Sequence, residues 1–318
     1  MHELPSLIAA IEFGIFALLE REGLSKDQIF QSAKLGKRGG DALLCVLCAT
    51  GYLKKFQQKY YLSDASRHFL LESSQNNWLP FLTQDSEGVK KMIDALRKDY
   101  DDCKKPSVSM ESWISGQISL EDGRRISAFM HSHSLSAAIA LAEIVEFTKF
   151  GVNRILDVGG GSGCFSIAIS KKQPQVHCTV LELADVHKVA QEYINSAGVD
   201  NVDAVAGNMF SIPFPTGYNG VFYSNILHDW NDEKCKIILK KSFDCLSKGG
   251  YIFIHEALLN EDESGPLFNC FFSMHMFLNT EGAQFTMTKL QVMLEEAGFS
   301  NVGIIPTHKM YSVVYARK

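Results

Sequence analysis

The feature that most constrains this chain is a change of residue pattern after Gly151. Before it, apolar residues recur mainly at helical spacing, and after it short β-rich runs alternate with helical stretches. The expected strands span residues 154–158, 178–183, 220–223, 251–254 and 311–315, and the expected helices span residues 165–171, 184–197, 233–246 and 288–297. Strands that alternate with helices are typical of a parallel sheet covered by helices. The sequence therefore predicts a mainly helical N-terminal half and a doubly wound α/β C-terminal domain.

The first hundred residues have the outline of a winged helix. The expected elements are a helix at 7–19 that stops before Gly23, a helix at 26–33 capped by Ser25, a break at Gly39-Gly40 before a helix at 41–50, and a two-stranded wing at 51–53 and 58–62. Residues 85–150 are expected to continue as helices. A winged helix binds DNA in some proteins and contacts protein in others. Because the basic residues here are few, we expect dimerisation rather than DNA binding.

Composition narrows the class of protein further. The 318 residues carry a net charge of -5, which offers no electrostatic basis for nucleic acid or an anionic membrane. No apolar run approaches the ~18 residues of a membrane span, and Glu12 inside the first apolar stretch argues against a signal peptide. The eight cysteines form no disulfide framework, so we expect a cytoplasmic protein. Cys45 and Cys48 form a CxxC without a second pair, and we interpret them as core thiols.

A glycine-rich turn follows the first expected strand of the α/β domain. Residues 155–158 (ILDV) run directly into GGGSG, so backbone at Gly159 and Gly161 can approach a ligand closely. Asp157 precedes the glycines, where a carboxylate would repel a pyrophosphate but suits a cationic ligand. Glu182 ends the next strand, where it can bind both hydroxyls of a ribose. These positions predict a site for S-adenosylmethionine, which carries a sulfonium and an ammonium group. Asn208 and Met209 lie in a later turn that fits over an adenine.

These motifs, with LHDW at 227–230, GGYIFIHEALL and LEEAGF, resemble the class I S-adenosylmethionine-dependent methyltransferases of the caffeic-acid and hydroxyindole O-methyltransferase group. The resemblance implies a seven-stranded Rossmann-like sheet with an antiparallel last strand, preceded by a helical dimerisation domain. We expect a winged-helix-like dimerisation domain at 1–100, a helical connector lining the substrate pocket at 101–150 and a catalytic domain at 151–318. The resemblance also implies a homodimer that acts on a small-molecule methyl acceptor. We expect no nucleic acid and no membrane as partners.

His228 is the expected catalytic base. It follows a strand at the ligand-bearing edge of the sheet, and an imidazole titrates near the pH at which a phenol or enol must lose its proton. By resemblance, Glu256 at the end of the next strand orients that imidazole. Asp229 either lines the substrate site or caps a local helix.

The chain departs from the family pattern at several positions. Gln284 stands where the family has a second orienting glutamate, and an amide raises the basicity of an imidazole less than a carboxylate does. Phe285 replaces an arginine, Ser224 replaces a lysine on the adenine side of the cofactor site, and Asn208 replaces an aspartate.

The acceptor site is expected along two segments. Met130 and His131 lie on the helix that lines the family's acceptor pocket, and Phe271 and His275 lie in a Phe- and Met-rich segment at 267–277. Gln284 completes this predicted set. Arg124 and Arg125 nearby are interpreted either as a clamp for a carboxylate or as solvated side chains.

Three functions remain open at the level of sequence. The first is O-methylation of a small hydroxylated compound with His228 as general base. The second is C-methylation of a 2-oxo acid assisted by a divalent metal that His228, Asp229 and His275 would hold. The third is a catalytically idle dimerising protein that binds S-adenosylmethionine.

Overall fold

The computed structural model describes residues 3–74, 76–77, 79, 87–101 and 110–318. Part of the helical stretch expected at 85–150 therefore lies outside the described residues. The chain divides into two compact units that are not consecutive in sequence. The helical unit comprises residues 1–109 and 259–286, and the sheet unit comprises residues 110–258 and 287–318. The sequence instead suggested three consecutive stretches, and the functional roles attached to them stay predictions.

The sheet unit is built on a seven-stranded sheet with the order β6-β5-β4-β7-β8-β10-β9. Its strands are β4 (Arg154–Val158), β5 (His177–Glu182), β6 (Val202–Ala206), β7 (Tyr218–Ser224), β8 (Leu246–Ala257), β9 (Ser300–Pro306) and β10 (Tyr311–Arg317). The strands from β6 to β8 in this order pair in parallel, and β10 is antiparallel to both β8 and β9. The predicted sheet with its antiparallel last strand is thus confirmed. Strand β9 was missed because residues 300–306 have neither alternation nor a continuous apolar run.

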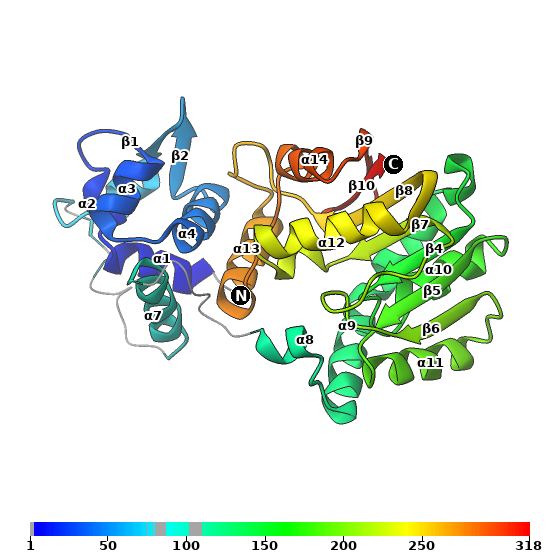
Figure 1. The fold of residues 1–318 in the computed structure, drawn as a ribbon. Coiled ribbons are helices and arrows are strands. Elements are labelled where there is room, and N and C mark those ends of the chain that lie inside the picture. Colours follow the sequence, from blue (N-terminus) through cyan, green and yellow to red (C-terminus); the bar gives the residue numbers. More distant parts are fainter. Residues whose placement is uncertain (1–2, 75, 78, 80–86, 102–109) are drawn as a thin grey trace. The chain divides into compact units, whose positions relative to one another are not determined.

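Helices cover both faces of this sheet (Figure 1). Helices α9 (Leu120–Ile144), α10 (Cys164–Lys172) and α11 (Val186–Ala197) pack together on one face, and α12 (Asp232–Cys245) and α14 (Met287–Glu296) pack together on the other. Helix α8 (Glu111–Ser115) and the short 3₁₀ turns η1 (Phe147–Phe150) and η2 (Leu227–Asp229) complete the unit. The central strands are buried on both faces, which explains their nearly continuous apolar sequences.

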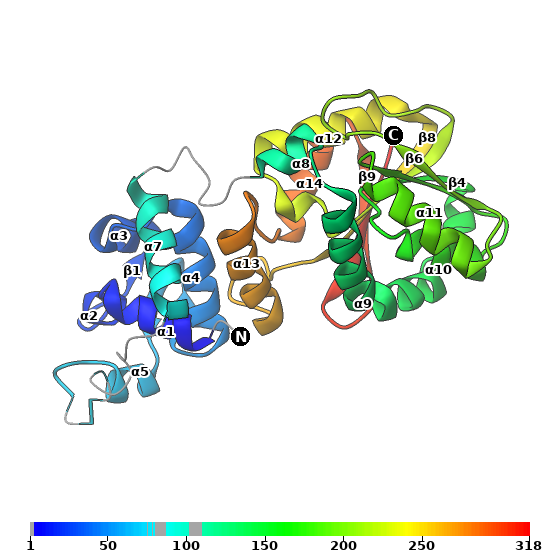
Figure 2. The ribbon, with the colours of Figure 1, turned by 90° about the horizontal axis from the view of Figure 1, so that it is seen from below.

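The helical unit contains a β-hairpin where the wing was predicted, but its first strand covers residues 53–56 rather than 51–53. Strands β2 (Leu53–Phe56) and β3 (Lys59–Leu62) form an antiparallel hairpin, and β1 (Leu24–Ser25) pairs with the far edge of β3. Helices α1 (Glu3–Glu12), α4 (Lys37–Ala49), α7 (Glu87–Asp101) and α13 (Leu267–Asn279) pack around one apolar core (Figure 2). Helix α5 (Asp64–Phe69) follows the wing. The cap predicted at Ser25 of α3 (Lys26–Ala33) is confirmed, and the structure adds Gln28, which completes a capping box with it.

The single helix predicted at 7–19 is wrong. The chain forms α1 and then a four-residue helix α2 (Ile15–Leu18), because Gly14 between them has a φ of 67°. An uninterrupted helix cannot include a residue in the left-handed region. The apolar stripe continues across the break because Ile15, Phe16 and Leu19 are buried in the same core.

The break predicted at Gly39-Gly40 is also wrong, because both glycines lie inside α4. A Cβ atom at Gly40 would lie 2.3 Å from the ring of Phe30, and one at Gly39 would lie 2.8 Å from Leu96 and 2.9 Å from Phe277. The glycines therefore permit close packing of neighbouring helices rather than a turn.

Candidate active site

The glycine turn lies at the carboxyl end of β4. Gly159, Gly161 and Gly163 all have positive φ values, between 58° and 72°, which side chains with a Cβ atom rarely adopt. Asp157 just before the turn is 1% exposed and accepts a hydrogen bond of 2.6 Å from Ser166 Oγ. Burial raises the pKa of Asp157 to about 7. A carboxyl group held in this way ionises readily when a cation approaches it.

Glu182 ends β5 beside the glycine turn. Its Oε1 accepts a hydrogen bond of 3.0 Å from the backbone of Gly161, and its Oε2 accepts one of 2.8 Å from the backbone of Leu183. Burial raises the pKa of this carboxyl group, and the two backbone hydrogen bonds counteract that rise. Each carboxylate oxygen retains a lone pair for a further donor. Glu182 therefore holds the turn in place and keeps acceptor capacity toward a ribose.

The turn after β6 is tied to neighbouring elements at two points. Asn208 donates through Nδ2 to the carbonyl of Ile114 at 2.8 Å, and its Oδ1 accepts from the backbone of Phe210 at 2.9 Å. Lys241 of α12 donates to the carbonyls of Met209, Phe210 and Ile212 at 2.6–2.9 Å. No sequence motif singled out Lys241, because only the fold brings its ammonium group to this turn.

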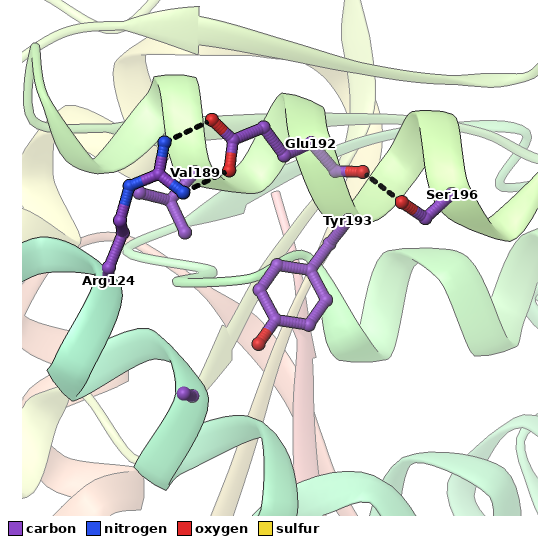
Figure 3. Close-up of a pocket in the computed structure, with 6 residues that line it drawn as sticks. Arg124, Val189, Glu192, Tyr193 and Ser196 are labelled. Atoms are coloured by element: carbon purple, nitrogen blue, oxygen red, sulfur yellow. Dashed lines mark hydrogen bonds and ion pairs between the residues drawn. The ribbon is translucent and has the colours of Figure 1, made fainter.

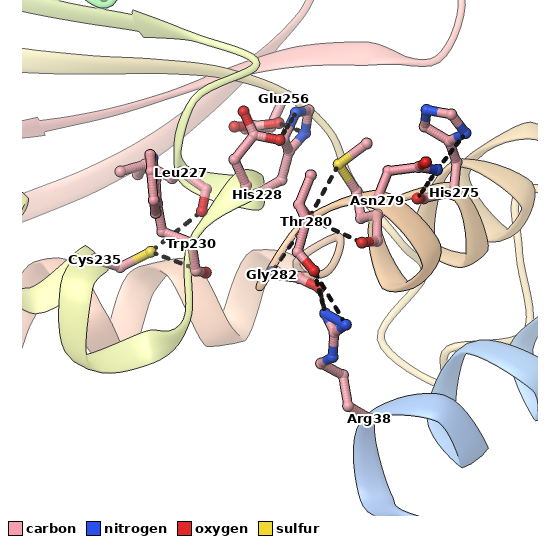
Figure 4. A network of polar contacts seen from close by, with 12 residues as sticks. Arg38, Leu227, His228, Trp230, Cys235, Glu256, His275, Asn279, Thr280 and Gly282 are labelled. Carbon is pink, nitrogen blue, oxygen red and sulfur yellow. Dashed lines mark hydrogen bonds and ion pairs between the residues drawn. The ribbon is translucent and has the colours of Figure 1, made fainter. Parts of the chain in front are cut away.

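His228 and Glu256 meet at the ends of β7 and β8, as predicted (Figure 4). His228 Nδ1 lies 2.7 Å from Glu256 Oε2, and the two side chains are 3% and 0% exposed. His228 Nε2 lies 3.7 Å from Asp229 Oδ1. Asp229 keeps 29% of its side chain exposed, and the surrounding protein raises its pKa to about 6. Because the carboxylate of Glu256 favours the proton on Nδ1, we assign the neutral imidazole of His228 its unprotonated nitrogen at Nε2.

The turn that carries His228 is held by contacts with neighbouring elements. Asn225, which opens it, has a φ of 54°, a conformation that Asn tolerates better than most residues. Cys235 Sγ of α12 lies 3.2 Å from the carbonyl of Leu227 and 3.6 Å from that of Trp230 (Figure 4). The Trp230 ring meets Phe210 edge to face at 4.6 Å between centroids. His228 therefore lies on a packed, hydrogen-bonded turn.

Ser224, predicted on the adenine side, contacts a residue that sequence reasoning missed. Its Oγ lies 2.9 Å from His255 Nδ1, and His255 Nε2 lies 3.2 Å from Thr307 Oγ1. The His255 ring stacks on Tyr311 at 4.7 Å. Burial lowers the pKa of His255 to about 3, so this imidazole is neutral. The position of His255 next to Glu256 in the sequence was the available signal.

Helix α9 brings His131 to the glycine turn. His131 Nδ1 lies 2.9 Å from Ser162 Oγ, and its ring stacks on Tyr193 at 4.6 Å. Burial lowers the pKa of His131. His133, two residues along, is close enough to His228 for that imidazole to lower its pKa further, although burial contributes most. Met130 is half-buried on the same helix. A role in acceptor binding stays a prediction for both Met130 and His131.

A cavity of about 400 Å³ lies between α9 and α11 (Figure 3). Arg124 and Glu192 face each other across it through two hydrogen bonds of 2.8 and 2.6 Å. Arg125 pairs with Asp122 at 3.2 Å. Both arginines that were considered as a carboxylate clamp thus already have carboxylate partners within the chain.

The remaining predicted residues belong to the helical unit. Phe271 and His275 lie on α13, where His275 is exposed and its carbonyl accepts from Asn279 Nδ2 at 2.9 Å (Figure 4). Gln284 is buried just after this helix. Because His228 and Asp229 belong to the sheet unit, the metal set with His275 stays a prediction. Within the described ranges, no group of three or more His, Cys, Asp or Glu residues is arranged to hold a metal ion.

The fold and the site together define a class I S-adenosylmethionine-dependent methyltransferase. The sheet order, the glycine turn, the buried Asp157 and Glu182 and the turn at Asn208 fit a nucleoside with a cationic sulfur. The carboxylate of Asp157 just before the glycine turn would not suit the pyrophosphate of a dinucleotide.

Comparison with known proteins identifies the family. Residues 92–300 match the model of the O-methyltransferase domain. The chain is 30% identical over 305 residues to a 3-hydroxy-5-methyl-1-naphthoate 3-O-methyltransferase from Streptomyces sahachiroi, covering 93% of this chain and 86% of that protein. The chain therefore belongs to the O-methyltransferase family, whose cofactor is S-adenosylmethionine.

Solved structures share its fold. An O-methyltransferase family 2 protein from Planctomyces limnophilus, solved in complex with apigenin, has a TM-score of 0.85 and 25% identity over 100% of this chain and 93% of that one. The human N-acetylserotonin methyltransferase, solved in complex with S-adenosylmethionine, has a TM-score of 0.63 and 23% identity over 99% and 93%. Among the described residues, no helix is both long enough and apolar enough to cross a bilayer.

Proposed function

We propose that this enzyme transfers a methyl group to a hydroxyl of an aromatic small molecule, with His228 as the general base. The observation that carries the proposal is the contact of 2.7 Å between His228 Nδ1 and Glu256 Oε2, in which both side chains are buried. The relative that methylates a hydroxynaphthoate and the neighbour that binds apigenin support a phenolic acceptor. This site is also the reason to favour an enzyme over an idle binding protein.

When bound, S-adenosylmethionine supplies a methyl carbon activated by its sulfonium sulfur. The residues of this chain position that cofactor and prepare the acceptor. Asp157 and Glu182 would hold the cationic and ribose parts of that cofactor, and the turn at Asn208 would cover its adenine. His228 Nε2 takes the proton of the acceptor hydroxyl, and this makes the acceptor oxygen a nucleophile toward the methyl carbon. Glu256 holds the imidazole in the required tautomer and stabilises the positive charge that it acquires. Alignment of the two reactants then accounts for much of the acceleration.

The test is release of S-adenosylhomocysteine from a panel of phenols and 2-oxo acids, each with and without EDTA. We expect turnover with at least one phenol, unchanged by EDTA, and a product methylated on oxygen by NMR. Turnover only with a 2-oxo acid, abolished by EDTA, would instead support metal-assisted C-methylation by His228, Asp229 and His275. Tight cofactor binding without turnover on either set would support a protein that binds S-adenosylmethionine without methyl transfer.

The role of His228 is tested by substitution. His228→Gln removes the base, and a loss of about 10²–10⁴-fold in kcat is expected for a general base. Glu256→Gln keeps the shape of the orienting side chain and is expected to lower kcat and to shift the pH profile of kcat. The matched control is His177→Gln, an exposed residue of β5, which should leave both parameters unchanged. Equal activity of His228→Gln and the control would refute the assignment.

We further propose that the enzyme works as a homodimer in the cytoplasm. The resemblance of the N-terminal region to a dimerisation domain and the seven free thiols among the described residues support this. Light scattering after size-exclusion chromatography tests the first point, since a monomer would weigh 35.4 kDa. Cell fractionation tests the second.

A further inference from the structure

The CxxC motif of α4 lies against a third cysteine that is distant in sequence. Cys45 Sγ lies 2.7 Å from Cys270 Sγ of α13, and the two residues are 3% and 0% exposed. Both are free thiols, and both belong to the helical unit. Cys48, one helical turn beyond Cys45, is only partly buried. The methyl-transfer site uses none of these three residues.

Other contacts hold α4 and α13 in register around the two sulfurs. Arg38 lies two turns before Cys45 and donates to the carbonyls of Phe277 and Thr280 at 2.7 and 3.0 Å. Its guanidinium group also lies 4.8 Å from the centroid of the Phe277 ring, two turns beyond Cys270. The helices therefore face each other along their length, and these contacts keep the backbones that carry the two thiols close together.

A second set of contacts joins α4 to the segment that precedes α13. Lys26 Nζ lies 2.8 Å from Asp41 Oδ1 on α4 and also contacts the carboxylate of Glu263, which precedes α13. The side chains of this ion-pair cluster are only about one third exposed, so about two thirds of their surface is shielded from solvent. It fixes the segment that leads into α13 relative to α4.

We propose that Cys45 and Cys270 are a redox-active pair that closes to a disulfide in the presence of a low-molecular-weight disulfide such as oxidised glutathione. A protein disulfide has a sulfur–sulfur bond of about 2.05 Å. The two thiol sulfurs need to approach by only about 0.7 Å, starting from 2.7 Å. Cytosolic disulfides of this kind are usually transient and sense redox conditions.

Cys48 provides the route by which the oxidant reaches a buried pair. Its thiolate attacks the small disulfide, forms a mixed disulfide and releases the first small thiol. Cys45 then attacks the sulfur of Cys48 and displaces the second small thiol, and Cys270 attacks Cys45 and returns Cys48 to a thiol. In total the small disulfide is reduced by two electrons, and the protons of the two protein thiols end on the two released small thiols. Burial raises the pKa of Cys48 to about 12, so the first step should accelerate as the pH rises.

The bond would covalently join α4 to the helix that carries Phe271 and His275. Both residues are candidates for the acceptor site, so closure would restrict that helix. This consequence rests on the proposed function, but formation of the bond does not. Peptide mapping detects the bond itself and is independent of methyl transfer.

The experiment treats the reduced full-length chain with millimolar oxidised glutathione, quenches it with an alkylating agent in denaturant and maps the peptides by mass spectrometry. We expect a peptide that links residues 45 and 270, a loss of about 2 Da from the unalkylated chain, and reversal by dithiothreitol. Cys48→Ser should form the same link more slowly, whereas Cys270→Ser should not form it.

Two results would overturn the proposal. One is full alkylation of residues 45 and 270 after prolonged oxidation of the wild-type chain, which needs no variant to fold. The other is a dominant link between different cysteines, such as 45 and 48. An unchanged closure rate in Cys48→Ser would refute the role of Cys48 as the entry point.

Discussion

Asp157 gives the sharpest prediction. Its buried carboxyl group should lower the stability of the fold when it is ionised, but the same negative charge is expected to bind the cofactor. Its pKa is about 7 in the folded protein against a usual value of 3.8, because the carboxyl group is buried. An acid with a raised folded pKa loses stability as the pH rises from its unfolded value to its folded value. The difference of 3.2 pKa units (7 minus 3.8) corresponds to at most about 4 kcal/mol above pH 7.

Asp157→Asn removes this penalty and keeps an oxygen that can accept from Ser166. Without ligand, the variant should be more stable than wild type by about 2–4 kcal/mol at pH 8 and nearly equal to it at pH 4. For a chain of this length the gain corresponds to a rise of about 3–6 °C in Tm. The same variant should bind S-adenosylmethionine at least about 100-fold more weakly at pH 8, because a desolvated charge partner is lost.

The assay is thermal denaturation without ligand from pH 4 to pH 8, followed by calorimetric titration with S-adenosylmethionine. Wild-type affinity should rise about tenfold per pH unit up to pH 7 and then level off, and the variant should show no such dependence. Asp203→Asn, at an exposed position of β6, is the matched control and should change neither quantity. Equal destabilisation of Asp157→Asn at both ends of the pH range would refute the reasoning, since it would mean that the ionised form stabilises the fold.

Three further predictions concern residues that position the site or the core. Lys241→Met removes the donor to three carbonyls of the turn at Asn208 and should raise the Kd for S-adenosylmethionine about tenfold by calorimetry, whereas Lys240→Met should not. His255→Phe should lower the free energy of unfolding by about 1–3 kcal/mol at pH 7. That deficit should shrink by about 2 kcal/mol at pH 5, because the neutral His255 of the wild type costs stability as the pH falls below 6.5; a constant deficit in denaturant titrations would contradict this. Gly40→Ala places a Cβ atom 2.3 Å from the Phe30 ring and should lower Tm by several degrees, and an unchanged Tm would show that this ring moves freely.

Much of the sheet unit was predictable because its signals are local. The β-rich runs, the glycine turn after Asp157 and the acids at strand ends all follow from residues within a few positions of one another. The parallel topology then brings strand ends to one edge, which is why Glu182 and Glu256 could be placed at the site from the sequence. The break predicted at Gly39-Gly40 was wrong for the opposite reason, since the role of these glycines depends on the distant residues that pack against them. The break at Gly14 was missed because it lies in the backbone, where the residue has a φ of 67°.

The sequence by itself determined the class of fold and the kind of cofactor, and it singled out the candidates for the base and its orienting acid, because each rests on a short motif at a strand end. Only the tertiary structure decided which residues support them. Lys241 of α12 donates to the turn at Asn208, and the two ring nitrogens of His255 contact Ser224 and Thr307. Cys45 contacts Cys270, which lies 225 positions further along the chain. Such contacts join segments far apart in the chain, and no local propensity encodes them. They arise when apolar burial fixes the helices and strands, and the polar groups carried inside must then find partners.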